Sequence, residues 1–441
     1  MSARIFAAFL LAILCRPQMA FADGPGRLDA VLAQASDDGL ARHFYQLRGG
    51  ALVWHGSRQA EADSRTALET LSTAAREGLD AERYRVYRDS GDSVADDVAL
   101  STALLAYMRD LATGRPDLKT LDRDVALAQP PFDAAMLLDQ ALRQHRLAPM
   151  LASLAPPFGG YAALKAELAR DPNGPAAPIL MANMERWRWM PRPLEADRIV
   201  VNVADASLQL WLAGKPALTS RVIVGRPATP TPILRADGAG LTVNPAWTVP
   251  QSIAVKEILP KLKRNHAYLA SQDMILLNGP PDDPHGLNIN WRAIRAGTFP
   301  YRIRQVPGPR NPLGQIKLEL PNHFDVYLHD TPGKAAFARP ARALSHGCVR
   351  VEQILPLASY ALNADLGAQE QIKQLIAAGE TKYVPLHRTL PVYFLYWTAF
   401  PDEQGVVQFR PDIYGRDKRL IAAMHPGGEK IASTAVSCPR G

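Results

Sequence analysis

The chain has 441 residues, of which 47% are hydrophobic and 21% are charged, and this composition is ordinary for a globular protein. At about 100–200 residues per domain, the length predicts two or three domains. The formal net charge of +7 is too modest to indicate nucleic-acid binding. Nucleotide use is also unsupported, because the sequence contains neither a phosphate-loop motif nor a glycine-rich dinucleotide motif.

Residues 1–22 are predicted to be a secretory signal peptide. They contain one early charge, an apolar run from Ile5 to Leu14, and small residues before Asp23 that suit a cleavage site. The apolar run is too short to span a bilayer, and no other stretch reaches membrane-spanning length. The sequence therefore predicts an exported protein without an integral membrane segment.

Residues 23–190 are predicted to form a helical domain. Apolar residues recur at helical spacing in four stretches, the first two of which are followed by glycine. These stretches are residues 66–75, 98–111, 134–147 and 161–168. A turn-rich linker at 171–175 and one more helix at 179–189 follow. This half contains few chemically reactive side chains.

The remaining sequence is mainly β. Short runs typical of strands alternate with turns, and two helices interrupt them. The expected strands are residues 198–203, 207–212, 218–224, 240–243, 316–320, 324–328, 392–397 and 406–409, and the expected helices are residues 352–362 and 368–378. A helical half followed by a mainly β half predicts an α+β protein. Its second domain would cover residues 191–388, and a strand-rich extension and tail would cover residues 389–441.

A long stretch inside the second domain, about residues 246–312, is rich in proline, glycine and charge. Loops of this length are uncommon unless they are functional, and a common function is a lid over a site. A passive surface loop is the alternative. The lid is favoured because Trp247, Tyr268, Trp291 and Phe299 give the stretch large side chains to pack.

The strongest chemical signal is the segment Ser345-His346-Gly347-Cys348-Val349-Arg350, with His329 upstream of it. A cysteine beside a glycine, with an imidazole supplied from another segment, suggests a thiolate nucleophile and its general base. The expected strand that ends just before His329 would give the imidazole a rigid support. A buried structural cysteine is the alternative. The neighbouring residues favour Cys348 as nucleophile and His329 as general base and acid.

His346 is a second candidate for the base, because residues two apart in an extended segment face the same way. A base also needs freedom to meet the thiol hydrogen, which favours His329. His346 is then predicted to be structural or to position groups near an oxyanion site. Gly347 would free backbone amides to point at a developing oxyanion, and Ser345 would form local hydrogen bonds.

Two charged neighbours have two interpretations each. Asp330 could orient the imidazole of His329 through its side chain or its backbone carbonyl, or it could form the turn before Thr331-Pro332-Gly333. Arg350 suits recognition of a substrate carboxylate by its guanidinium. The alternative for Arg350 is a structural partnership with Glu352 or a nearby carbonyl.

Zinc binding is a rival chemistry for the same residues. By residue type, the ligands would be His323, His329, His346 and Cys348, but the sequence has no CxxC or HExxH spacing. We therefore predict no metal and no cofactor. Cys438 lies near the polar C-terminus, so both cysteines that follow the signal peptide are predicted to be free thiols, with a disulfide between them as the alternative.

These residues resemble the L,D-transpeptidase (YkuD-type) family, whose signature is a histidine followed later by Ser-His-Gly-Cys-Val-Arg. Residues around the signature match as well, and so do segments before it. They are residues 330–334, 342–344, 222–225, 231–232, 243–250 and 183–189. The resemblance is to the large periplasmic branch of the family, which carries an N-terminal helical scaffold domain. Residues 44–54 and 78–80 resemble the opening of that scaffold domain.

The resemblance implies a YkuD-like β-sandwich catalytic domain with an inserted lid, located in the periplasm and associated with the cell wall. It implies peptidoglycan stem peptides as partners and a carbapenem as an inhibitor class. Cys348 would attack a stem tetrapeptide, and the thioester would pass to an amine of a second stem, which forms a 3→3 cross-link. Hydrolysis of the same bond class by an L,D-carboxypeptidase or amidase, and a non-catalytic wall-binding protein, are the alternatives.

Overall fold

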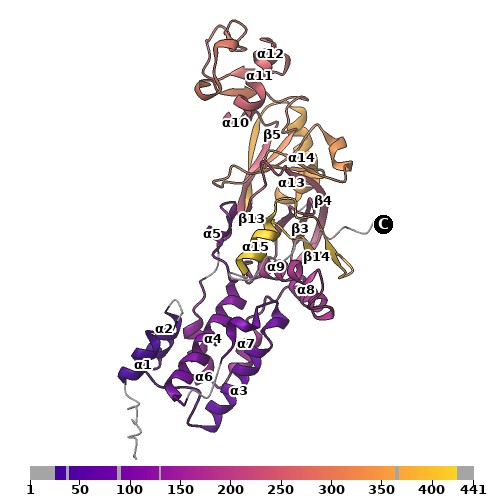
Figure 1. Cartoon of the computed structure of the whole chain (residues 1–441). Helices are drawn as coiled ribbons and strands as arrows, with labels where there is room; N and C mark the ends of the chain where they lie inside the picture. Colours follow the sequence, from indigo (N-terminus) through magenta and orange to yellow (C-terminus); the bar gives the residue numbers. More distant parts are fainter. Residues whose placement is uncertain (1–24, 36–38, 87–90, 129–130, 363–366, 425–441) are drawn as a thin grey trace, which may run out of the picture. The chain divides into compact units, whose positions relative to one another are not determined.

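The computed structural model describes residues 25–35, 39–86, 91–128, 131–362 and 367–424 (Figure 1). The predicted signal peptide and Cys438 lie outside the described residues. Contacts divide the chain into two compact units. Of the described residues, the helical unit comprises those up to Ala74 with those in Asp80–Arg109 and Asp133–Ala152, and the sheet unit comprises the rest.

Two helices of the helical unit, α3 and α6, begin where short polar side chains cap them. Ser57 accepts a hydrogen bond from the Ala60 amide, and Asp133 accepts one from the Met136 amide. The predicted helix 134–147 is two helices, because His145 adopts a left-handed φ of 54° between them. The helices are α1 (Pro25–Leu32), α2 (Leu40–Leu47), α3 (Arg58–Ser72), α4 (Ser93–Thr113), α6 (Ala134–Arg143) and α7 (Leu147–Ala152).

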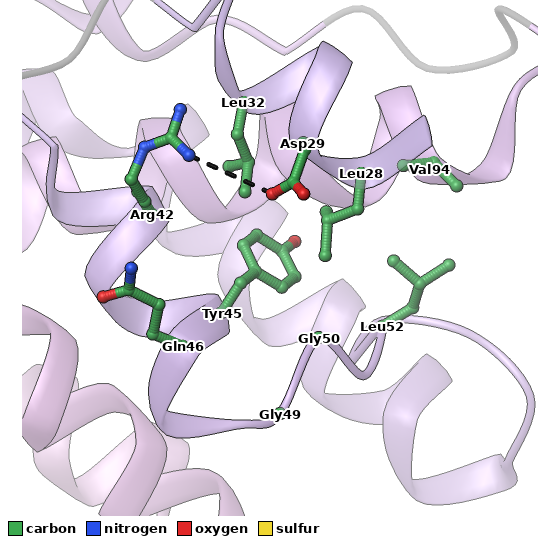
Figure 2. Close-up of a pocket in the computed structure, with 10 residues that line it drawn as sticks. All are labelled: Leu28, Asp29, Leu32, Arg42, Tyr45, Gln46, Gly49, Gly50, Leu52 and Val94. Carbon is green, nitrogen blue, oxygen red and sulfur yellow. Dashed lines mark ion pairs between the residues drawn. The ribbon is translucent and has the colours of Figure 1, made fainter. Parts of the chain in front are cut away.

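A buried carboxylate organises the loop that follows α2. Asp97 is fully buried and accepts hydrogen bonds from the amides of Val53 and Trp54 and from the Tyr45 hydroxyl. Burial raises the pKa of Asp97, although these hydrogen bonds oppose the change. Tyr45 also lines an apolar cavity of about 450 Å³ beside α1 and α2, with the Asp29–Arg42 ion pair at 4.0 Å (Figure 2). This cavity contains none of the predicted site residues.

The sheet unit is built on a ten-stranded sheet of the described residues, in the order β1-β5-β13-β2-β3-β4-β12-β10-β9, with β11 paired to β4. Strand β9 also pairs with β5, so the path closes on itself. The strands are β1 (Val125–Ala126), β2 (Arg198–Asn202), β3 (Ser207–Leu212), β4 (Lys215–Gly225), β5 (Ile233–Val243), β9 (Ile316–Glu319), β10 (Leu328–His329), β11 (Ala343–Ser345), β12 (Val349–Val351) and β13 (Lys382–Leu395).

Most of the predicted strands are present, and the α+β class is confirmed. The predicted strand 324–328 is wrong except at Leu328, because residues 321–327 are irregular with a turn at 323–324. The Asn322 side chain closes this turn by donating to the carbonyls of Leu320 and Val326, and Asp325 has a φ of 53°. The ladder resumes only at Leu328, which places His329 at the second position of a short strand.

Helices pack around the sheet. They are α5 (Leu118–Leu121), α8 (Gly159–Arg170), α9 (Ala177–Arg188), α13 (Ile354–Leu362), α14 (Gly367–Ala377) and α15 (Arg416–Met424). Helix α13 packs against β9 and β13, and α15 packs against α9 and α5. The predicted domain limits stay a prediction. By contact, α8 and α9 lie in the sheet unit, whereas the sequence predicts that residues up to 190 belong to the helical domain.

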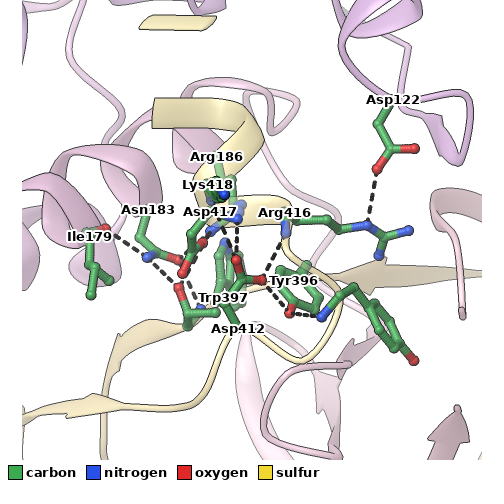
Figure 3. A network of polar contacts seen from close by, with 12 residues as sticks. Asp122, Ile179, Asn183, Arg186, Tyr396, Trp397, Asp412, Arg416, Asp417 and Lys418 are labelled. Atoms are coloured by element: carbon green, nitrogen blue, oxygen red, sulfur yellow. Dashed lines mark hydrogen bonds and ion pairs between the residues drawn. The ribbon is translucent and has the colours of Figure 1, made fainter. Parts of the chain in front are cut away.

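Buried ionic groups hold α15 and the segment before it (Figure 3). Arg186 of α9 pairs with Asp417 of α15, and each side chain is less than a tenth exposed. Arg416 pairs with Asp122 at 3.2 Å and donates to the Thr231 carbonyl at 3.0 Å. The predicted strand at 406–409 is present as β15 (Val407–Phe409), paired with β14 (Ala399–Pro401). The C-terminal extension therefore contains a helix as well as strands.

Residues 246–312 form a small subdomain with its own core, which we call the insert. A three-stranded sheet of β6 (Trp247–Thr248), β8 (Ile303–Gln305) and β7 (Met274–Leu276) stands beside α10 (Gln251–Ile253), a π-helical turn (Ala254–Ile258), α11 (Leu259–Leu262) and α12 (Tyr268–Ser271). Trp291 is fully buried and stacks with Phe299. The predicted aromatic packing is confirmed, whereas motion of the insert as a lid stays a prediction.

No helix in the described part of the chain is long and apolar enough to cross a membrane.

Candidate active site

Strand register places two of the predicted site residues, His329 and Arg350, on one face of the sheet. His329 of β10 is opposite Arg350 of β12 and Lys317 of β9. The adjacent pairs, Leu328 with Val349 and with Leu318, have buried apolar side chains. Because side chains alternate along a strand, the three polar residues lie on the face opposite the apolar core.

Cys348 lies one residue before β12 and is half-buried. Its thiol donates to the Asp325 carbonyl, with Sγ 3.6 Å from the oxygen. Burial raises the pKa of the Cys348 thiol above its usual range, although hydrogen bonding from Tyr327 and the charge of Lys317 oppose the change. The thiol is therefore protonated at neutral pH. No hydrogen bond joins Sγ to the His329 ring among the described residues.

His329 is buried, with 4% of its surface exposed. Burial lowers its pKa to about 3; the positive charges of Arg350 and Lys317 act in the same direction, and Asp330 opposes them. The imidazole is therefore neutral at neutral pH. Its Nδ1 atom is buried and has no hydrogen-bond partner in the described chain. The Tyr327 ring packs edge-on against it, with ring centroids 5.5 Å apart.

Ser345 fixes the backbone on both sides of Gly347. Its hydroxyl donates to the Cys348 carbonyl at 2.6 Å and accepts a hydrogen bond from the Gly347 amide at 3.1 Å. Gly347 has a φ of 121°, a conformation that side chains rarely adopt, which accounts for a glycine at this position. Its amide is already used, whereas the Cys348 amide donates to no group in the part of the chain described.

His346 points to the insert rather than to Cys348. Its Nε2 atom is 2.6 Å from Glu257 Oε1, and Glu257 belongs to the π-helical turn of the insert. Arg226 pairs with the same carboxylate at 3.3 Å. Although partial burial opposes it, the hydrogen bond and charge of His346, together with Arg226, lower the pKa of Glu257. His346 therefore links the cysteine segment to the insert.

The side chain of Asp330 is used for local structure. One carboxylate oxygen accepts from the Gln315 amide at 2.9 Å, and the other pairs with Lys334. The carboxylate also lies against Gly314, where a Cβ atom would be only 2.3 Å from it. No hydrogen bond joins this carboxylate to His329 among the described residues.

Arg350 has no counter-ion in the described part of the chain, and its buried Nε has no hydrogen-bond partner. Burial lowers its pKa, although the neighbouring Cys348 opposes the change. The alternative pairing with Glu352 is absent, because Glu352 forms a two-point pair with Arg221 instead. The guanidinium is therefore available to an anionic ligand.

The rival zinc ligands do not converge. His323 is exposed and packs at a tilt against Phe324, with ring centroids 3.9 Å apart. His346 pairs with Glu257. Within the described residues, no group of three or more histidine, cysteine or acidic side chains is arranged to hold a metal ion.

Sequence reasoning missed Lys317 and Tyr327. The ammonium of Lys317 lies 4.2 Å from the centre of the Tyr327 ring and pairs with Glu319 at 2.7 Å. The alternation of polar and apolar residues in β9 could have placed Lys317 on the polar face. Only the pairing of β9 with β10 places it opposite His329.

The protein thus has an α+β fold, and its candidate site carries a cysteine and a histidine on one face of a sheet. The family model for the L,D-transpeptidase catalytic domain (YkuD) matches residues 196–375, and the Scaffold domain model matches residues 30–168. Residues 196–375 therefore belong to the L,D-transpeptidase catalytic-domain family, with a scaffold domain before them. The resemblance predicted from the sequence is confirmed.

A putative L,D-transpeptidase of Haemophilus influenzae is 34% identical over 244 residues, which are 55% of this chain and 49% of that protein. The match thus spans about half the length of this relative. Two solved structures are also similar. They are the Ldtfm–avibactam carbamoyl enzyme (14% identity, 46% of this chain and 49% of that chain, TM-score 0.23) and an L,D-transpeptidase from Mycobacterium smegmatis (12% identity, 45% and 58%, TM-score 0.23).

Proposed function

We propose that this protein is a peptidoglycan L,D-transpeptidase that forms 3→3 cross-links through a thioester on Cys348. Membership of the catalytic-domain family implies a cysteine-dependent acyltransferase. The observation that supports these roles most directly is the sheet face that carries a half-buried thiol, a neutral buried imidazole and an unpaired guanidinium.

The first half of the reaction is acylation of Cys348. The thiol turns from the Asp325 carbonyl to the imidazole, and His329 takes its proton. The thiolate attacks the carbonyl of the diaminopimelate residue that precedes the terminal D-alanine of a tetrapeptide stem. The Cys348 amide is free to stabilise the oxyanion. The carbon–nitrogen bond then breaks, His329 returns the proton to the leaving amine, and D-alanine departs.

In the second half, an amine of another stem attacks the thioester and restores the thiol. His329 accepts the amine's proton and passes it to the departing sulfur, so that no cofactor is needed. Arg350 would pair with a substrate carboxylate through a charge-assisted hydrogen bond. The linkage of His346 to Glu257 holds the insert beside the cysteine segment, where the insert would limit the access of water.

Water could replace the second amine on the same groups, so a carboxypeptidase or amidase remains the alternative function. We also propose that the protein is exported to the periplasm and associates with the cell wall, because of the signal-peptide pattern in residues 1–22.

The test is incubation of the protein without residues 1–22 with a disaccharide-tetrapeptide, followed by mass measurement of the products. A cross-linked dimer and free D-alanine support the transpeptidase. A tripeptide alone would show a hydrolase, and unchanged substrate would show a binding protein.

The matched variants are Cys348→Ala and, as a control, His323→Ala, whose ring is exposed and lies outside the site. Cys348→Ala should abolish both turnover and the covalent adduct with a carbapenem, whereas His323→Ala should retain both. A carbapenem adduct on the Cys348→Ala protein would place the nucleophile elsewhere.

A further inference from the structure

Thr231 contacts the cysteine segment from a distant part of the sequence. It is fully buried, and its hydroxyl donates to the Gly347 carbonyl at 2.7 Å. The same hydroxyl accepts a hydrogen bond from the Gly225 amide at 2.9 Å. The Thr231 hydroxyl therefore uses both its donor and its acceptor on backbone groups, one next to Cys348 and one at the end of β4.

The backbone of Thr231 is held by the C-terminal segment. Its amide donates to the Tyr414 hydroxyl at 3.3 Å, and its carbonyl accepts from Arg416 at 3.0 Å. The Tyr414 hydroxyl in turn donates to the Gly225 carbonyl. Arg416 is only 4% exposed and is anchored by Asp122 (Figure 3). Tyr414 and Arg416 lie beyond residue 375, where the match to the catalytic-domain family ends.

The hydrogen bond from Thr231 sets the direction of the Cys348 N–H, which the flexible backbone at Gly347 does not set by itself. The Gly347 carbonyl and the Cys348 amide belong to one planar peptide group, so an anchored oxygen sets the direction of the N–H on the other side. Glycine gives this group more rotational freedom than any other residue would. Ser345 fixes the peptide groups on either side, through the Gly347 amide and the Cys348 carbonyl. Thr231 fixes the one between them.

We propose that Thr231 is a positioning residue for acyl transfer: it aims the Cys348 amide at the oxyanion, and Tyr414 and Arg416 of the C-terminal segment hold it in place. The inference rests on the proposed function, since it concerns the acylation of Cys348. The proposal adds Tyr414 and Arg416, which lie outside the matched catalytic domain, to the residues that support the active site.

The test compares two reactions of the same thiol. Acylation by a carbapenem or by the tetrapeptide develops an oxyanion, whereas alkylation by iodoacetamide does not. Thr231→Val keeps the shape of the side chain but removes its hydroxyl. We expect acylation to slow about 10- to 100-fold, a smaller loss of rate than complete removal of an oxyanion-hole donor causes. The rate of alkylation should stay within about twofold of the wild-type rate.

Thr231→Ser restores the hydroxyl and should recover acylation to within about threefold of the wild-type rate, because the same hydrogen bond is available. Tyr414→Phe removes the group that holds Thr231 and should slow acylation selectively, by about 3- to 10-fold, as expected for a modest misplacement. Thr219→Val is the matched control, because Thr219 is exposed on β4 away from the cysteine segment. It should leave both rates unchanged.

Wild-type protein that is not acylated on Cys348 would reject the proposed function itself. If wild type is acylated, equal acylation of Thr231→Val and wild type would overturn the inference, and so would an equal fall in both reactions. Should Thr231→Val not fold, Tyr414→Phe decides in its place, and unchanged acylation in that variant overturns the role of the C-terminal segment.

Discussion

The buried imidazole of His329 should make the stability of the sheet unit depend on pH. Its pKa is lowered from about 6.5 in the unfolded chain to about 3 in the folded chain, mainly by burial. Between these values the unfolded state binds one more proton than the folded state, so stability falls as the pH is lowered. From about pH 7.5 to pH 5 the loss amounts to about 2 kcal/mol at 1.36 kcal/mol per pKa unit.

His329→Gln removes the titrating group, so it should remove about 2 kcal/mol of the stability difference between the two pH values. Urea unfolding followed by tryptophan fluorescence measures this difference, because every tryptophan except Trp54 belongs to the sheet unit. His323→Gln is the control, since that ring is exposed in the folded chain and its removal should leave the difference unchanged. If His329→Gln and wild type lose equal stability on acidification, the imidazole is not held neutral by burial.

Three further measurements test the electrostatics and the packing. Alkylation of Cys348 should rise steadily with pH through alkaline values, because burial raises the pKa of the thiol; a rate plateau below neutrality would instead indicate a thiolate–imidazolium pair. Glu257→Gln breaks the ion pairs that Glu257 of the insert forms with His346 and Arg226. Hydrogen exchange of the backbone amides in residues 254–262 should quicken by up to about fivefold, because partly exposed ion pairs contribute about 1 kcal/mol or less to stability. Unchanged exchange would mean that other contacts hold the insert. Glu185→Ala leaves the fully buried Arg188 without its carboxylate partner, so the free energy of unfolding should fall by about 3–5 kcal/mol. Glu167→Ala removes a partner from an exposed ion pair and should lower the free energy of unfolding by less than about 1 kcal/mol. Similar urea midpoints for the two variants would contradict the burial argument.

Much of the architecture could be predicted because it depends on local patterns. Helical periodicity located α3, α4 and α9, and runs of strand-forming residues bounded by turns located β2 and β3. Boundaries moved where a single backbone angle or side chain intervened, as at His145 and Asn322. Such local hydrogen bonds compete with regular structure and leave a weak signal in the sequence.

The roles of two site neighbours required the tertiary structure. Glu352 follows Arg350 closely in sequence, yet it pairs with Arg221 on the adjacent strand β4. Asp330 is next to His329, yet its side chain serves Gln315 and Lys334. Proximity in sequence suggested side-chain partners, but both carboxylates pair with other residues.

By itself the sequence determined the family, the cysteine segment and the helical-then-β order, because a contiguous motif and local periodicity encode them. The tertiary structure alone decided the protonation of the site and its supports. The low pKa of His329 depends on burial and on Arg350 and Lys317, which two neighbouring strands supply. Thr231 reaches Gly347 across more than a hundred residues. Burial and register are properties of the assembled sheet, so no local pattern records them.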